Sequence, residues 1–207
     1  MIIKKEWMIP LLKIIFGIGI IMTVIWGYVF SGGAKYMYEL TCISNLAAGL
    51  ILIVDGVFYK SEKASFLYLF ILPTIMSVFL VTVICTLTRI SHFNFSGGFL
   101  FMHAINPLVI LVFYSLTYPK IDKKTELIRI FTSPLLMIIY LLFDYIRYLI
   151  TGELIYGLIP NEYLYPWLII IIGIMIYALL AFMSYGLTRL REKIFELQSK
   201  KNSNKHD

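Results

Sequence analysis

The sequence predicts an all-α, polytopic membrane protein: a bundle of six transmembrane helices with both termini in the cytoplasm. Of its 207 residues, 60% are hydrophobic and only 14% are charged. The mean hydropathy of +0.85 is far above that of a soluble domain. The apolar residues form runs of roughly 20, the length that crosses a hydrocarbon layer about 30 Å thick. The basic residues lie in the gaps between these runs.

Each apolar run predicts one transmembrane helix. The first run follows Lys4 and Lys5, as in a signal peptide, but its length and its Trp26 and Tyr28 favour a retained helix. We expect a single transmembrane domain over residues 1–190 and a charged cytoplasmic tail over residues 191–207. The six runs cover residues 8–30, 39–59, 66–88, 98–118, 129–150 and 166–188.

Orientation follows from the basic residues, because cytoplasmic loops carry the excess of Lys and Arg. The N-terminus, the second and fourth loops and the C-terminus hold all of the 18 basic residues except Lys35, Arg89 and Arg147. This asymmetry predicts that both termini are cytoplasmic and that the protein resides in the cell membrane. Lys13 is counted here with the cytoplasmic group. Asp55 falls at the inner end of the second helix, where it could pair with Lys60 or reach water.

The net charge of +6 does not indicate nucleic-acid binding, because such proteins gather their basic residues on one solvated face. Basic residues between apolar runs indicate contact with membrane lipids instead. Cys42 and Cys85 lie inside apolar runs without a C-x-x-C pair, which predicts buried thiols; a disulfide between them stays open. No motif for a metal or another cofactor is present in the sequence.

A few polar residues fall inside the apolar runs, where an ionisable side chain costs roughly 2.5 to 3.5 kcal/mol. Their positions place them at one depth, in the outer part of the bilayer. Each also has a structural explanation: hydroxyls bond to their own helix, a histidine can join helices, and Asp144 with Arg147 can be an intrahelical pair. The residues are Thr41, Ser44 and Asn45 in the second run, His103 and Asn106 in the fourth, and Asp144 and Arg147 in the fifth.

Several intramembrane chemistries lack their motifs in this sequence. There is no H-E-x-x-H, G-x-S-x-G or G-x-G-D motif and no P-loop. His103 is the single histidine inside an apolar run, whereas bis-histidine haem binding needs two. Transporters usually show an internal repeat or helices broken by Gly and Pro at the middle of the membrane. Neither feature is evident in this sequence.

Four short segments resemble a known family, the androgen-induced gene product and its relatives, which are membrane threonine hydrolases of lipid esters with small bacterial members. The resemblance spans about residues 35 to 190. The segments are "YMYELTCISNL" from Tyr36, "HAINP" from His103, "SPLLMIIYLLFDYIRYLITG" from Ser133 and the doublet Tyr165 and Pro166.

The resemblance implies that Thr41 is the nucleophile and His103 its base, and that the substrate is a fatty-acyl ester. In such a mechanism a histidine takes the proton of the hydroxyl, as in serine hydrolases. We further expect Asp144 to orient His103 and Asn45 to stabilise the oxyanion, with Asn106 and Arg147 in support. The alternative is a non-catalytic membrane protein that binds a lipid or a partner on the same scaffold. The sequence leaves the acyl chain and the oligomeric state open.

Overall fold

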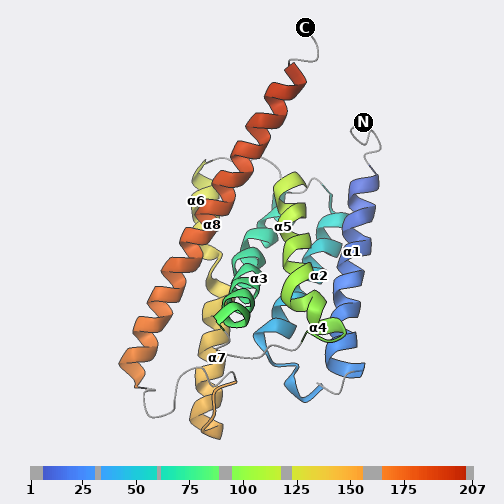
Figure 1. The fold of residues 1–207 in the computed structure, drawn as a ribbon. Helices are drawn as coiled ribbons and strands as arrows, with labels where there is room; N and C mark the ends of the chain where they lie inside the picture. The colour runs from blue at the N-terminus through green and yellow to red at the C-terminus, as the bar shows by residue number, and fades with distance from the viewer. Residues whose placement is uncertain are drawn as a thin grey trace.

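The computed structural model describes residues 7–30, 34–59, 62–88, 95–117, 123–155 and 165–203. All regular structure in these ranges is helical, without a strand. The long helices run up and down through the bundle, with α3 and α5 between α1 on one side and α8 on the other (Figure 1). The predicted all-α class is therefore confirmed.

The long helices are assembled from several helical segments, two of which are π-helical and one 3-10. In chain order the segments are α1 (Met8–Val24), η1 (Ile25–Phe30, π), η2 (Ala34–Tyr36, 3-10), α2 (Leu40–Val57), α3 (Glu62–Thr88), α4 (Gly98–Leu100), η3 (Phe101–Ile105, π), α5 (Asn106–Thr117), α6 (Lys123–Thr132), α7 (Leu135–Thr151) and α8 (Pro166–Ser203).

Five helical stretches are long and apolar enough to cross a membrane. In α3, which occupies the position of the third predicted run, the apolar stretch among the described residues is the shorter Phe70–Val83. Order and approximate bounds agree with the six predicted runs, as in a multi-pass membrane protein. The five stretches are Met8–Phe30, Leu40–Val57, Gly98–Leu116, Lys123–Thr151 and Pro166–Leu197.

The beginning of α1 and the end of α8 lie at the same end of the bundle (Figure 1). We call this the terminal end; α2 ends and α6 begins on this side. At the opposite end, the far end, α2 begins at Leu40 and α7 ends at Thr151. The first and last long helices therefore have their outer ends on the same side of the bundle (Figure 1).

One predicted boundary differs from the structure. The fifth run begins earlier than expected, at Lys123, and is divided between α6 and α7 next to Pro134. Proline lacks an N–H group and disfavours helix in the residue before it, so a break at this point is expected physically. The helix α8 continues past residue 190 to Ser203, and Arg191, the first residue of the predicted tail, is buried with only 2% exposure.

Glycines bring α1 and α2 into close contact. A Cβ atom at Gly17 would lie 2.7 Å from the Gly49 carbonyl oxygen, and one at Gly49 would lie 2.9 Å from the Gly17 oxygen. Nearer the terminal end, a Cβ at Gly56 would lie 2.8 Å from the Pro10 oxygen. Small residues let membrane helices approach closely. Van der Waals packing then holds the helices together, because the hydrophobic effect does not act between helices in lipid. The α1–α2 pair is therefore a rigid support for the residues that it carries.

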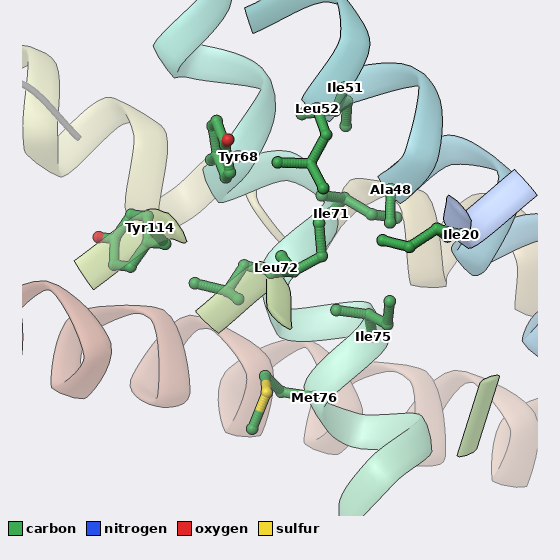
Figure 2. Close-up of a cluster of buried hydrophobic side chains, with 11 residues drawn as sticks. Ile20, Ala48, Ile51, Leu52, Tyr68, Ile71, Leu72, Ile75, Met76 and Tyr114 are labelled. Carbon is green, nitrogen blue, oxygen red and sulfur yellow. The ribbon is translucent and has the colours of Figure 1, made fainter. Parts of the chain in front are cut away.

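The main apolar core lies around α3, which packs between α2, α5 and α8 (Figure 2). Large apolar side chains on the outside of the described bundle, such as Leu142, Ile170 and Phe182, are more than half exposed, as expected for contact with lipid. The buried cluster consists of Ile20, Ala48, Ile51, Leu52, Tyr68, Ile71, Leu72, Ile75, Met76, Ile110 and Tyr114.

The two π-helical segments lie at the far end, in the first and fourth long helices. The segment η3 ends at Ile105, just before Asn106 and Pro107. A proline cannot donate the bond that a regular helix would direct to the carbonyl four residues earlier, here that of His103, and its ring crowds that carbonyl. A wider π-turn relieves this conflict, and such turns are frequent at functional sites.

A buried ion pair joins α1 to α2 near the terminal end. The Lys13 ammonium group binds the Asp55 carboxylate, and these residues are 1% and 3% exposed. The Lys13 nitrogen also lies 5.2 Å from the centre of the Tyr59 ring and 5.7 Å from that of Tyr68. The charge count treated Lys13 as a residue of the cytoplasmic membrane surface. In the structure Lys13 is buried instead. Lys60, the partner expected for Asp55, lies outside the described residues.

Candidate functional site

Thr41 lies in the first turn of α2, at the far end of the bundle, and is 4% exposed. The helix begins after Glu39, whose backbone is extended and whose side chain does not cap the helix. The α1–α2 glycine contacts hold this helix in place. Thr41 is therefore a buried residue next to the positively polarised end of a helix.

His103 lies in the middle of the π-helical segment η3 and is 5% exposed. Its ring is packed between aromatic side chains, with the Phe95 and Phe99 ring centres each 6.0 Å away. The backbone of η3 follows from Pro107, so the proline helps to set the direction of the imidazole. Thr41 and His103 are therefore both buried inside the bundle.

Asn45 connects the surroundings of these two residues. Its side-chain nitrogen donates to the Thr41 carbonyl oxygen at 2.8 Å and to the Met102 carbonyl oxygen at 3.3 Å. Met102 directly precedes His103. One amide group therefore lies between the backbone of Thr41 and the backbone beside His103, which places both residues in one layer of the bundle.

Asn106 extends this connection to α1. Its side-chain nitrogen donates to the Asn45 side-chain oxygen at 2.8 Å and to the Thr23 hydroxyl at 3.0 Å. We call Thr23, Asn45 and Asn106 the amide network. Because the described bonds of the Asn45 amide reach two carbonyls, its geometry suits positioning rather than the oxyanion binding expected from sequence.

Asp144 and Arg147 lie near the end of α7, also at the far end. The Asp144 carboxylate accepts a hydrogen bond from the Ile155 backbone N–H at 2.8 Å. Arg147 donates to the Glu153 carbonyl at 2.9 Å, and its guanidinium lies 5.0 Å from the centre of the Tyr38 ring. These contacts stabilise the segment after α7 and bring the end of α7 beside Tyr38, which lies just before α2. The described hydrogen bond of Asp144 supports this loop, and the expected orientation of His103 by Asp144 stays a prediction.

The structure also shows a pair that the sequence analysis did not select. The buried Tyr28 donates its hydroxyl to the half-buried Glu39 carboxylate at 2.7 Å. Burial raises the pKa of Glu39, and the hydrogen bond from Tyr28 partly opposes this rise. The Tyr28 ring packs on Phe99 at 5.1 Å, and Phe99 contacts His103. An acidic residue two positions before Thr41 was the signal that could have identified this pair.

Cys42, next to Thr41, is a buried free thiol that packs with Val24, Tyr28 and Met102. The Cys85 side chain, its hypothetical disulfide partner, lies outside the described side chains. Within the described ranges, His, Cys, Asp and Glu residues nowhere gather in a group of three suited to a metal ion. Comparisons with protein-family models, with curated proteins and with solved structures found no match.

Proposed function

We propose that the chain is an integral membrane hydrolase of lipid esters, with Thr41 as nucleophile and His103 as base. The observation that carries this proposal is the Asn45 bridge between the Thr41 carbonyl and the carbonyl that precedes His103. Two buried, chemically competent side chains in one layer of a lipid-embedded bundle are suited to an ester that arrives from the membrane. The resemblance of the Thr41 and His103 segments to membrane threonine hydrolases agrees with it.

The reaction proceeds in two steps. His103 takes the proton from the Thr41 hydroxyl while the oxygen attacks the ester carbonyl carbon, and the tetrahedral intermediate expels the alcohol, which receives that proton. Water then attacks the acyl-threonine with His103 again as base, releasing the fatty acid and restoring Thr41. The N-terminal turn of α2, which Glu39 leaves without a side-chain cap, stabilises the developing oxyanion. The amide network keeps nucleophile and base in register.

The proposal locates this site in the outer leaflet of the cell membrane, with both termini cytoplasmic and membrane lipids as its surroundings. Cysteines introduced for Lys123 at the terminal end and Glu153 at the far end test the orientation in a background without Cys42 and Cys85. A membrane-impermeant thiol reagent added to intact cells should label only the cysteine at position 153. Labelling only at position 123 would reverse the topology.

The catalytic test uses a fluorophosphonate probe and hydrolysis of lipid esters by the purified protein. Thr41→Ala should abolish labelling, and His103→Asn should remove most labelling and turnover. The double variant should cost little more than either single one, because nucleophile and base act as a unit. Ser44→Ala is the matched control, since Ser44 is buried one turn away and bonds to the same Thr41 carbonyl. Equal hydrolysis with and without the Thr41 hydroxyl would refute the proposal.

A second function, a non-catalytic membrane protein that binds a lipid or a partner, is favoured by one observation. The described hydrogen bonds of Asn45, Asn106 and Asp144 are made within the bundle, as in a structural network. Folded protein that neither labels nor hydrolyses esters would select this function.

A further inference from the structure

The chain reverses its direction at the end of α7, close to the first turn of α2. Gly152 ends the helix with a left-handed backbone, φ +77°, and its N–H donates to the Tyr148 carbonyl oxygen at 2.8 Å. Glycine adopts this conformation without a side-chain clash. The Thr151 hydroxyl also donates to the Glu153 carbonyl oxygen at 3.3 Å. We call residues 153–155, which follow this turn, the return segment.

Asp144 and Arg147 fix the return segment to α7. The buried Asp144 carboxylate accepts a hydrogen bond from the Ile155 N–H at 2.8 Å, and Arg147 donates to the Glu153 carbonyl oxygen at 2.9 Å. Asp144 lies about two turns before the end of α7, so the chain runs back roughly 11 Å along the helix to reach it (Figure 1). Two side chains about one turn apart thus hold both ends of the return segment.

The same residues contact the chain directly before Thr41. Ile155 packs against the apolar cluster that contains Leu40, the residue that precedes Thr41. The Arg147 guanidinium lies 5.0 Å from the centre of the Tyr38 ring, three residues before Thr41. The end of α7 therefore supports the entry to α2 at two points, through an apolar cluster and through a cation–π contact.

The first turn of α2 depends on support from outside the helix. The first N–H groups of a helix have no acceptor within it, and the Glu39 side chain does not cap this end. A helix end without a side-chain cap is less stable than a capped one. From η1, the Tyr28 hydroxyl holds the Glu39 carboxylate at 2.7 Å. The contacts of α7 add a second support, so two helices together fix the turn that carries Thr41.

We propose that Asp144 is a positioning residue for Thr41 that acts through the return segment, with Arg147 as its partner. This inference rests on the proposed ester hydrolysis, in which Thr41 is the nucleophile. A misplacement of about 1 Å can slow such a reaction about 100-fold. In this role the Asp144 side chain must supply an acceptor oxygen. A carboxylate that orients a catalytic histidine must supply its negative charge as well, so the two roles can be separated.

The first test compares two replacements of Asp144 in the full chain by lipid-ester hydrolysis. Asp144→Leu removes the acceptor and should lower kcat by about 100-fold with the pH profile unchanged. Asp144→Asn keeps an acceptor oxygen and should retain at least about a third of the wild-type kcat. An equal loss in both variants with a shifted pH profile would mean that Asp144 acts on His103 by its charge, and would overturn the proposal. A wild-type kcat in folded Asp144→Leu would also overturn it, because contacts that only stabilise the loop predict that result.

A second variant keeps the proposal testable if Asp144→Leu does not fold. Arg147→Gln removes an exposed hydrogen bond and the contact with Tyr38, and should lower kcat by about tenfold. Lys35→Gln is the matched control, since Lys35 is exposed at the same end of the bundle and its ammonium group lies 4.8 Å from the centre of the Tyr36 ring. An unchanged kcat in Arg147→Gln, equal to that of Lys35→Gln, would overturn the proposal.

Thiol reactivity separates failure of this proposal from failure of the proposed function. In Thr41→Cys protein without Cys42 and Cys85, N-ethylmaleimide reports how often the buried first turn of α2 opens. Adding Asp144→Leu should raise the rate of modification about tenfold, and adding Asp144→Asn should leave it nearly unchanged. If the wild type neither labels with fluorophosphonate nor hydrolyses esters, the proposed function fails and the thiol rates alone decide. Equal rates in all three proteins would then overturn the positioning role of Asp144.

Discussion

Two networks of buried polar groups, one at each end of the bundle, differ in their chemistry. At the far end, the amide network of Thr23, Asn45 and Asn106 is neutral. Toward the terminal end, several buried groups carry formal charge: Lys13 and Asp55 form an ion pair, and Glu126, Arg129 and Arg191 are buried in α6 and α8.

This difference has energetic consequences. A neutral amide that loses a partner in a low-dielectric interior leaves one unsatisfied group, which costs about 1 to 3 kcal/mol. A buried charge that loses its partner is far more costly. The far end can therefore hold a hydroxyl and an imidazole close together with little risk to stability. The contact between α1 and α2 therefore depends strongly on both residues of the ion pair, Lys13 and Asp55.

The largest effect is expected for the ion pair. Lys13→Met leaves the Asp55 carboxylate buried without its ammonium partner and should lower the free energy of unfolding by about 3 to 5 kcal/mol. The double variant Lys13→Met and Asp55→Leu should recover most of this loss. Titration with sodium dodecyl sulfate in mixed micelles measures both. A double variant as unstable as Lys13→Met would mean that the lysine acts through packing against Tyr59 and Tyr68 instead.

A smaller effect is expected for the amide network. Asn45→Leu removes the bonds to the Thr41 and Met102 carbonyls and to Asn106, and should cost about 1 to 3 kcal/mol. Ser44→Ala, the control on the same helix, removes one weak bond of 3.3 Å and should cost about 0.6 kcal/mol or less. The same micelle titration compares them. If Asn45→Leu lowered the free energy of unfolding as much as Lys13→Met does, the neutral network and the ion pair would not differ in this respect.

The smallest effect is a pH dependence at the far end. Because burial raises the pKa of Glu39, the folded state binds this proton more tightly than the unfolded state does. The resulting stabilisation is complete below the unfolded pKa and is lost as the pH rises through the higher folded pKa. The stability of the wild type relative to Glu39→Gln should therefore increase on acidification from about pH 8 to pH 4. A flat difference would show that the Tyr28 bond offsets burial.

Within the candidate site, sequence spacing accounts for contacts between residues on one helix. Thr41 and Asn45 are four positions apart, so their shared face and their hydrogen bond follow from helical geometry. The roles expected for Asn45 and Asp144 rest on contacts between distant parts of the chain. Their observed partners, Met102 and Ile155, could not be derived from spacing.

By itself the sequence determined the helical class, the order of the six apolar runs and the burial of Thr41 and His103. These follow from hydrophobicity, because a bilayer requires long apolar helices and expels unpaired polar groups. Only the tertiary structure decided that Lys13 pairs with Asp55, that Arg191 enters the bundle and that Asn45 joins α2 to η3. Each of these depends on the rotation and register of helices that meet across the bundle, which close packing sets and local periodicity does not.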